Sequence, residues 1–343
     1  MDKALICGIS GQDGAYLSRL LLEKGYEVHG TDRPDIPVDI TNLQILGIDS
    51  EIEYHSLDLS NYEAILKTVD RIMPDEVYNL AAISSVGKSF EFPILTAEIN
   101  GLSSLKILEC LRRTNSNTKF FQASSSEMYG IPLTAPQSEL TEFYPKSPYA
   151  SAKLFAHHSV INYREAYDLF ACSGIMYNHE SPLRGVEFVT RKITNSLARI
   201  KYDLQEKLVL GNLSVKRDFG YAKEYVEAMW LILQQKEADD FVVATGETHS
   251  IREFTEVAAE YLGYTIEWEE SGSSEKGVDK KSGKILVEVS SEFFRPTEVG
   301  NIIGDASKAA RKLNWAPKVN FEKLVKIMVD ADIDLVQKSL TAK

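Results

Sequence analysis

The chain has 343 residues, of which 44% are hydrophobic and 26% are charged, and its formal net charge is −12. This composition excludes an intrinsically disordered chain and a collagen-like chain. The length is enough for about two domains, and the acidic balance argues against nucleic acid as a partner, since duplex binding needs a basic surface.

Cysteine usage and hydropathy narrow the class of protein further. The three cysteines, Cys7, Cys110 and Cys172, are far apart and form no CxxC pair, which predicts a reduced, cytoplasmic protein without a metal site. The first residues do not follow the pattern of a signal peptide. No run approaches the ~18 apolar residues that a membrane span needs, so we expect no membrane partner.

Short apolar runs alternate with longer amphipathic stretches through the first half of the chain. The runs predict buried strands at 4–7, 27–30, 76–80, 119–123 and 169–176, and the stretches predict helices at 14–24, 62–71, 99–112 and 149–166. Parallel neighbours in a sheet need crossover connections, which are usually helices. The predicted fold class is therefore α/β, a Rossmann-like doubly wound parallel sheet with a smaller mixed α/β substrate lobe.

The alternation loosens after about residue 178. Helices are predicted at 189–202, 222–235 and 251–262, a strand at 241–244, a surface loop or flap at 270–284, and a turn followed by a helix within 313–336. We expect residues 1–178 to form a dinucleotide-binding domain to which 212–252 return. Residues 179–211 and 253–343 are expected to form the substrate lobe.

A glycine-rich loop joins the first strand to the first helix and reads Gly8-Ile-Ser-Gly11-Gln12-Asp13-Gly14. Glycines there allow a tight turn and close approach of the backbone to a pyrophosphate, and the helix N-terminus attracts phosphates. Asp32 follows Gly14 by eighteen residues, about where a carboxylate would meet the ribose 2′-hydroxyl. The loop therefore predicts a bound nicotinamide dinucleotide.

The choice between NAD and NADP stays open at this point. Asp32 would repel a 2′-phosphate, whereas the neighbouring Arg33 would bind one. Asp58 and Leu59 lie between the predicted strands 27–30 and 76–80, where they would reach the adenine, although an aspartate that only holds its own loop is nearly as common.

Four residues predict the reaction chemistry. Tyr149 and Lys153 are four apart on one helix face, and the Lys153 ammonium would favour the phenolate of Tyr149. Ser125 ends a predicted strand, where catalytic groups of such sheets gather, and its hydroxyl would hydrogen-bond a substrate oxygen. Glu127 adds a base able to remove a proton beside a newly formed ketone, unless it only caps a helix or pairs with a cation.

Several longer strings carry a resemblance to a known family. Besides the segments above they are 74–82, 178–182, 188–194, 216–220, 244–247 and 294–299. With them the chain resembles extended short-chain dehydrogenases/reductases that act on nucleotide sugars, and among these the GDP-mannose 4,6-dehydratase family. The resemblance implies a lyase that converts GDP-D-mannose to GDP-4-dehydro-6-deoxy-D-mannose and water with bound NADP, and a lobe that binds the nucleotide-sugar.

The resemblance also implies a role for each matching residue. Ser125, usually threonine in the family, hydrogen-bonds the sugar O4 while Tyr149 deprotonates it and hydride passes from C4 to the nicotinamide. Glu127 removes the C5 proton and helps to expel the C6 hydroxyl as water, and the hydride returns to C6. The cofactor-binding residues are then Gly8, Gly11, Gln12, Asp13, Gly14, Asp32, Arg33, Asp58, Leu59, Leu80, Ala81, Ala82, Ser84, Tyr149, Lys153, His179 and Arg184. The substrate-binding residues are Ser85, Ser125, Glu127, Asn178, Val189, Lys192, Arg217, Arg295 and Glu298.

Two positions depart from the family pattern. The stretch 31–37 has one arginine and two aspartates where the family has paired arginines that reach the 2′-phosphate and a neighbouring subunit. Leu95 replaces a tyrosine that commonly lies against the cofactor. The first departure weakens the case for NADP over NAD and for a tetramer. We therefore expect a homodimer through helices 99–112 and 149–166, with a homotetramer as the alternative.

Other functions fit the same residues less well. A related GDP-sugar such as GDP-manno-heptose stays open as the substrate, because one extra carbon is worth only ~1–3 kcal/mol of discrimination. A nucleotide-sugar epimerase or reductase would not need a carboxylate at position 127. A dinucleotide sensor without turnover is expected to lack part of the set Ser125, Tyr149 and Lys153, and all three are present.

Overall fold

The computed structural model describes residues 1–34, 39–294, 300 and 302–341, and the described chain forms two compact units. Unit 1 comprises Met1–Tyr177, Ala222–Gly246 and Val299–Ala316, and unit 2 comprises Asn178–Tyr221, Glu247–Glu298 and Pro317–Lys343. The segment 222–246 that returns to unit 1 is shorter than the expected 212–252. The segment 299–316, expected in the substrate lobe, also lies in unit 1.

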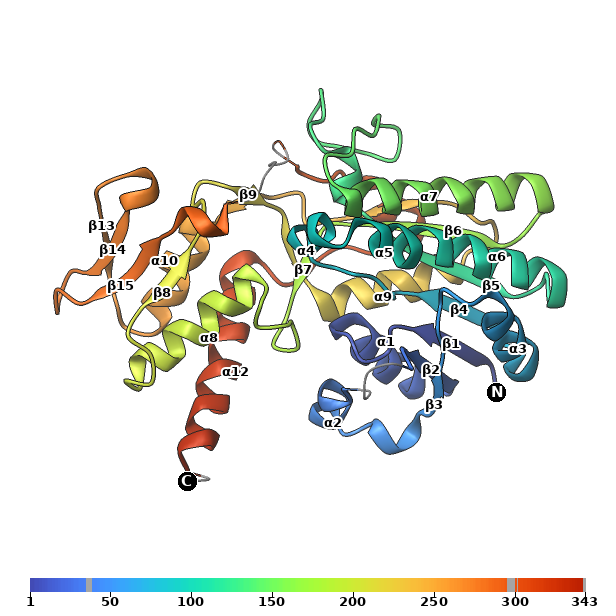
Figure 1. Ribbon diagram of the computed structural model, residues 1–343, viewed down its shortest axis with the longest axis horizontal. Helices are drawn as coiled ribbons and strands as arrows, with labels where there is room; N and C mark the ends of the chain where they lie inside the picture. Colours follow the sequence, from blue (N-terminus) through green and yellow to red (C-terminus); the bar gives the residue numbers. More distant parts are fainter. Residues whose placement is uncertain (35–38, 295–299, 301, 342–343) are drawn as a thin grey trace. The chain divides into compact units, whose positions relative to one another are not determined.

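Within the described ranges, unit 1 is built on a seven-stranded parallel sheet (Figure 1). Its strands are β1 (Lys3–Cys7), β2 (Glu27–Asp32), β3 (Glu53–Ser56), β4 (Glu76–Asn79), β5 (Lys119–Ser125), β6 (Ala171–Met176) and β11 (Phe241–Val243). The order β11-β6-β5-β4-β1-β2-β3 places β1 beside β4, so the winding reverses between them. Open α/β sheets bind ligands at such a switch point, and the predicted fold class is confirmed.

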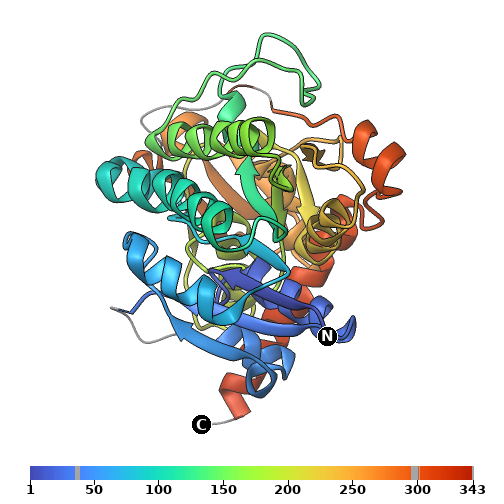
Figure 2. The same ribbon diagram turned by 90° about the vertical axis from the view of Figure 1, so that its right-hand side faces the viewer.

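Helices cover both faces of this sheet. They are α1 (Gln12–Glu23), α2 (Thr41–Leu46), α3 (Tyr62–Ile72), α4 (Val86–Glu91), α5 (Pro93–Ala97), α6 (Ser103–Thr114), α7 (Pro148–Tyr167), α9 (Ala222–Leu233) and α11 (Ser307–Leu313), with single turns η1 (Asp49–Glu51), η2 (Glu98–Leu102) and η3 (Ser126–Tyr129). Helices α3, α6 and α7 bury apolar residues of β1, β4 and β5 in one core. Figure 2 shows α6 (teal) and α7 (green) side by side.

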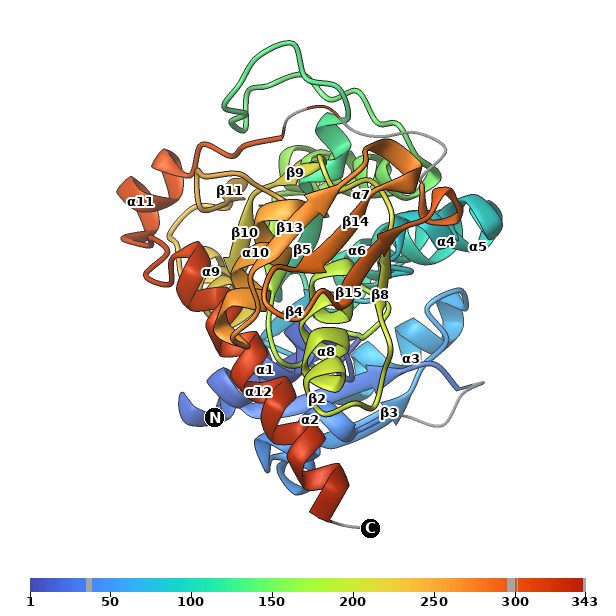
Figure 3. The same cartoon turned by 90° about the vertical axis from the view of Figure 1, so that its left-hand side faces the viewer.

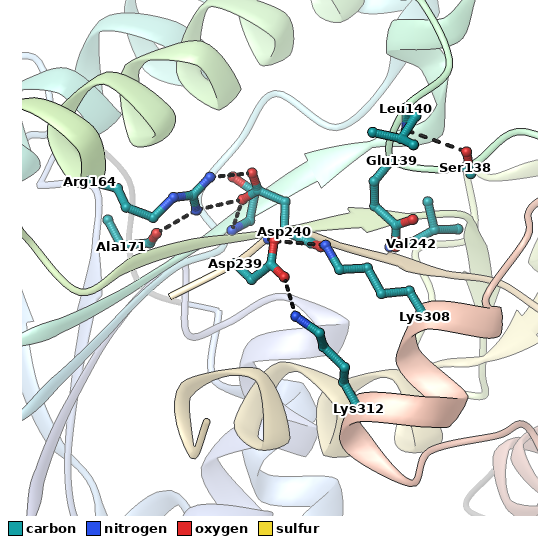
Figure 4. A network of polar contacts seen from close by, with 11 residues as sticks. Ser138, Glu139, Leu140, Arg164, Ala171, Asp239, Asp240, Val242, Lys308 and Lys312 are labelled. Carbon is teal, nitrogen blue, oxygen red and sulfur yellow. Dashed lines mark hydrogen bonds and ion pairs between the residues drawn. The ribbon is translucent and has the colours of Figure 1, made fainter. Parts of the chain in front are cut away.

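A network of ion pairs ties α7, β11 and α11 together within unit 1 (Figure 4). Arg164 of α7 donates to Asp240 at 2.6 Å, and Asp240 also accepts the backbone N–H of Ser173 on β6. Lys308 and Lys312 of α11 both donate to Asp239, at 2.7 and 2.9 Å. These contacts explain why residues 299–316 pack with the sheet despite their distance from it in the sequence.

Unit 2 packs three helices, α8 (Val189–Lys201), α10 (Ile251–Tyr261) and α12 (Phe321–Thr341), around an apolar core. Its described strands form a four-stranded sheet in the order β13-β14-β15-β8 (Figure 3). These strands are β13 (Ile266–Glu269), β14 (Lys276–Asp279), β15 (Ile285–Val289) and β8 (Leu208–Leu210), and two further pairs join β7 (Asn178–Glu180) to β10 (Phe219–Tyr221) and β9 (Lys216–Arg217) to β12 (His249–Ser250).

The prediction of a surface loop at 270–284 was wrong, because this segment contains β14. That strand pairs antiparallel with both β13 and β15. Burial in this strand alternates, and its buried residues are Gly277 and Asp279. Because neither has an apolar side chain, the alternation is not visible in the sequence. A Cβ at Gly277 would lie 3.0 Å from the Trp268 ring, so the cross-strand indole supplies the apolar surface that the strand itself lacks.

No helix in the described part of the chain is both long enough and apolar enough to cross a membrane. Cys7, Cys110 and Cys172 are all buried and none forms a disulfide.

Candidate active site

The loop between β1 and α1 is shaped by glycines at its two ends. Gly8 has φ +85°, and a Cβ there would lie 2.8 Å from the backbone N of Ala81. A Cβ at Gly14 would lie 2.5 Å from the Gly8 carbonyl oxygen and 2.6 Å from that of Ile9. The backbone therefore folds back on itself more tightly than any other residue allows. Such a cradle at the amino end of a helix, beside the β1/β4 switch point, fits the pyrophosphate of a dinucleotide.

Two carboxylates lie at the ends of the strands that follow. Asp32 is the last residue of β2, and its Oδ1 accepts the backbone N–H of Arg33 at 2.9 Å, while the Arg33 side chain is exposed. Asp58 follows β3, and its Oδ1 accepts the backbone N–H of Ser60 at 2.8 Å. Asp58 therefore holds its own loop, and the adjacent Leu59 is buried.

The segment after β4 is held by a residue that the sequence analysis missed. Asn100, buried in η2, accepts the N–H of Ile83 at 2.8 Å and donates to the Ile83 carbonyl at 3.1 Å. This two-way bond fixes the stretch that contains Leu80, Ala81, Ala82, Ser84 and Ser85. No sequence signal distinguished Asn100, because the helical stretch around it holds other polar residues such as Glu98 and Ser103.

Within that stretch, Leu80, Ala81 and Ala82 are half-buried and Ser84 is exposed. Ser85 caps α4, where its Oγ accepts the N–H of Lys88 at 3.3 Å. Leu95, in α5, is exposed.

The carboxyl end of β5 and the start of α7 bring the predicted catalytic residues into one region. Ser125 ends β5, and Glu127 is buried in the turn η3 that follows. The Oγ of Ser125 accepts the N–H of Glu127 at 3.2 Å and so caps this turn. Ser147 caps α7 and Pro148 opens it, which places Tyr149 in the first turn. Helix α7 packs against both β5 and η3.

Lys153 connects these two elements. Its side chain is 2% exposed, and its Nζ donates to the carbonyl of Ala123 on β5 at 2.8 Å and lies 5.9 Å from the centre of the Tyr149 ring. Burial lowers the pKa of Lys153 to about 8, against the opposing charge of Asp13. A cation is therefore held beside the phenol at neutral pH.

His157, one turn after Lys153, is a second residue that the sequence analysis missed. Its Nδ1 lies 3.2 Å from the Oγ of Ser124, the residue before Ser125, and the ring is covered edge-on by Phe143. Burial lowers the pKa of His157 to about 4, so the ring is neutral at pH 7 and positions the end of β5. The adjacent pair His157-His158 on a helix gave no signal of which ring makes this contact.

Unit 2 carries the remaining described candidates. Asn178 and His179 are half-buried in β7, and the Nε of Arg184 lies 3.4 Å from the buried Glu180 carboxylate while its guanidinium stacks 3.8 Å from the Phe188 ring centre. Glu180 also accepts the Thr190 hydroxyl at 2.5 Å.

Three further unit 2 candidates lie on α8 and β9. Val189 begins α8, and Lys192 lies with its Nζ 3.7 Å from the Phe293 ring centre, where burial lowers the pKa of Lys192. Arg217 on β9 is buried and donates to the Lys216 carbonyl at 2.8 Å. A buried guanidinium of this kind suits a phosphate ligand. Arg295 and Glu298 lie outside the described residues.

Comparisons with known proteins show the family of the chain. The family model described as GDP-mannose 4,6 dehydratase matches residues 5–328. The chain is 49% identical to GDP-mannose 4,6 dehydratase 1 of Arabidopsis thaliana over 98% of this chain and 91% of the relative, and 47% identical to the GDP-mannose 4,6 dehydratase of Drosophila melanogaster over 98% and 87%.

Solved structures share the fold. A UDP-glucose 4-epimerase from Thermotoga maritima superposes with a TM-score of 0.81 at 23% identity over 98% of this chain and 99% of the other. A dTDP-glucose 4,6-dehydratase from Bacillus anthracis, solved in complex with NAD, has a TM-score of 0.79 at 18% identity over 96% of each chain.

Proposed function

The chain belongs to the GDP-mannose 4,6-dehydratase family, and from this premise we propose how its residues perform the reaction. The protein is a nucleotide-sugar hydro-lyase that uses a nicotinamide dinucleotide and converts GDP-D-mannose to GDP-4-dehydro-6-deoxy-D-mannose and water. One observation supports the residue roles. Ser125 ends β5, Glu127 lies in the turn η3, and Tyr149 and Lys153 lie at the start of α7. Helix α7 packs against both β5 and η3.

The catalytic steps divide among these four side chains. Tyr149 removes the proton of the sugar O4 while the Ser125 hydroxyl hydrogen-bonds that oxygen, and Lys153 stabilises the phenolate. A nicotinamide dinucleotide held by the glycine-rich loop would supply the hydride chemistry, as acceptor of hydride from C4 and donor of hydride to C6. Glu127 removes the C5 proton, which the C4 ketone has made acidic, and then gives it to the C6 hydroxyl, which leaves as water. When C6 receives hydride, C5 regains a proton from the Tyr149 phenol, which holds the proton taken from O4, and the phenolate is restored.

The candidate binding residues are divided between the cofactor and the substrate in this proposal. In unit 1 the glycine-rich loop, Asp32, Arg33, Asp58, Leu59 and the stretch 80–84 hold the dinucleotide, and Ser85 contacts the sugar. In unit 2, Asn178, Val189, Lys192 and Arg217 hold the GDP-sugar, with the cations on its diphosphate. His179 and Arg184 contact the cofactor, and Arg295 and Glu298 complete the nucleotide site.

The cofactor is proposed to be NADP, as the family resemblance implies, with the exposed Arg33 on the 2′-phosphate. Asp32 favours the alternative, NAD. Titration of the dinucleotide-free protein with both cofactors decides between them, and Arg33→Gln should weaken NADP about tenfold while it leaves NAD unchanged. Equal weakening of both cofactors would contradict this role of Arg33.

Glu127→Gln tests the assignment of the base. The purified protein incubated with GDP-mannose should give a product lighter by one water without net cofactor reduction, and Glu127→Gln should lower the rate of water loss by about 10²–10⁴-fold. Glu142→Gln, an exposed carboxylate in the following loop, is the matched control and should react like the original protein. If wild type loses no water from GDP-mannose, a GDP-heptose is the next substrate to test. If Glu127→Gln reacts normally, another group is the base.

We further propose a cytoplasmic homodimer. Three buried free thiols suit a reducing compartment. Exposed apolar side chains on α5, η2 and α7 of unit 1, among them Ile94, Leu102 and Phe155, form a surface that a second copy would cover.

A further inference from the structure

Two histidines and a glutamate that the dehydratase chemistry does not use lie together on the outer strands of the unit 1 sheet. His29 is on β2, and Glu53 and His55 are on β3. The strands are parallel, with His29 opposite Glu53 and Thr31 opposite His55. Because alternate residues of a strand share a face, the three side chains project from the same face of the sheet.

The three sets of donor atoms form a small triangle. His29 Nδ1 lies 3.0 Å from His55 Nε2, while the Glu53 oxygens lie 3.6 Å from His29 Nδ1 and 3.7 Å from His55 Nε2. Zinc–nitrogen bonds of about 2.0–2.1 Å in a tetrahedron separate the ligand atoms by about 3.3–3.4 Å. Each of the three distances, two of which run to different oxygens of Glu53, is therefore within a few tenths of an ångström of what a tetrahedral ion requires.

The two histidines of the cluster are buried and therefore held in place, whereas the glutamate is on the side open to solvent. The His29 and His55 side chains are only 4% and 6% exposed, whereas the Glu53 side chain is 64% exposed. The two rings are stacked with their centroids 5.3 Å apart. An ion would enter past Glu53 and keep one coordination position toward solvent.

The outer contacts of the rings determine where their protons lie. Glu27 accepts from His29 Nε2 at 2.9 Å, and the Arg71 guanidinium donates to His55 Nδ1 at 2.8 Å. A carboxylate only accepts and a guanidinium only donates. His29 therefore carries its proton on Nε2 and presents a bare Nδ1, while His55 carries its proton on Nε2 and donates it to His29.

We propose that His29, His55 and Glu53 form a binding site for a divalent transition-metal ion of the zinc class that links β2 to β3, with water as the fourth ligand. The carboxylate of Glu27 on the far nitrogen of His29 is the usual second partner of a metal-bound imidazole. The cysteine pattern predicted no metal site, whereas the site proposed here has histidine and carboxylate ligands.

Arg71 makes the proposal specific. Metal on His55 Nε2 moves the ring proton to Nδ1, where it faces the Arg71 donor and loses the 2.8 Å contact. Arg71 thus opposes the ion, and its removal should strengthen binding. If the histidine pair had only a structural role, removal of Arg71 would not strengthen metal binding.

The test uses the full chain, without a histidine tag, stripped of metal by a chelator and titrated with Zn²⁺ in a calorimeter, with its melting temperature recorded in parallel. We expect one ion per chain and a higher melting temperature. Glu53→Gln, on an exposed side chain, should weaken binding at least about tenfold, and Glu27→Gln about tenfold. Arg71→Gln should bind more tightly than the original chain.

His158→Gln is the matched control, because His158 is exposed and outside the cluster, and it should bind Zn²⁺ unchanged. Co²⁺ in place of Zn²⁺ should give the intense visible absorption of four-coordinate cobalt, and this should be lost in Glu53→Gln. No binding, binding that is unchanged in Glu53→Gln, or weaker binding in Arg71→Gln would each overturn the proposal and leave the cluster as a hydrogen-bonded pair.

Discussion

At the scale of single residues, the proposed active site depends on side chains whose backbone neighbours hold them. Lys153 keeps its charge at neutral pH because its pKa of about 8 is still above 7, and its bond to the Ala123 carbonyl fixes the ammonium near Tyr149. Ser125 and His157 both act on the end of β5, one through the Glu127 N–H and the other through Ser124. The reacting groups therefore share one rigid support.

His157 makes stability depend on pH. Its pKa is lowered to about 4 in the folded chain, against about 6.5 when unfolded, so between these values the unfolded chain binds more protons. The free energy of unfolding should fall as the pH drops from about 6.5 toward 4, by up to about 3 kcal/mol. Urea unfolding at several pH values should show a shallower fall in His157→Asn, whose Oδ1 replaces Nδ1. His158→Asn should keep the original slope, and equal slopes in all three chains would refute the assignment.

The glycines of the β1–α1 loop should separate folding from cofactor binding. A Cβ at Gly14 meets backbone at 2.5 Å, whereas a Cβ at Gly11 meets nothing closer than 3.5 Å. Gly14→Ala should therefore destabilise the protein by about 1–3 kcal/mol. Gly11→Ala should fold normally yet bind the dinucleotide about tenfold or more weakly, because its methyl group projects where the pyrophosphate approaches. Melting curves and cofactor titrations measure both, and normal affinity in Gly11→Ala would show that the phosphates bind elsewhere.

At the scale of elements, unit 1 is joined by polar ties between segments far apart in the sequence. Asp239 and Asp240, just before β11, bind α7 on one side and α11 on the other (Figure 4). Asn100 in η2 likewise fixes the stretch after β4. In unit 2, Asp332 of α12 is fully buried and pairs with Arg191 of α8 at 2.8 Å. Asp240, Asn100 and Asp332 are buried, so each needs its partner because it is removed from water.

Breaking the Asp240 tie should weaken unit 1. Asp240→Asn leaves the Arg164 guanidinium, itself four-fifths buried, with a neutral partner, and should lower the free energy of unfolding by about 3 kcal/mol. Chemical denaturation compares this variant with Asp334→Asn, an exposed carboxylate on α12 that should change stability by less than about 0.5 kcal/mol. Similar small effects from both changes would mean that the ion pair contributes nothing.

At the scale of the whole molecule, apolar exposure on α5, η2 and α7 supports the proposed dimer. Leu102→Glu combined with Phe155→Glu should convert the dimer to a monomer, since two charges would be buried at the interface. Light scattering after gel filtration gives the mass. Ile45→Glu changes a still more exposed apolar residue, on α2. It is the control, and this variant should remain dimeric. A dimer that survives the double change would place the interface elsewhere.

The sequence by itself determined the Rossmann-like sheet, the glycine-rich loop and the family. Hydrophobic periodicity and glycine spacing are local features, and β1, α1 and α7 lie within two residues of their predicted limits. The strand β14 was missed because its apolar surface comes from Trp268 on a neighbouring strand.

Only the tertiary structure decided which distant residues meet. The return of residues 299–316, the roles of Asn100 and His157 and the juxtaposition of His29 with His55 all depend on strand register and helix packing. The residues of these contacts are 17 to 33 positions apart in the sequence, as in the pairs Ile83–Asn100, His29–His55 and Ser124–His157. No local pattern encodes such a pair, because the contact forms only when the sheet brings separate segments within hydrogen-bonding distance.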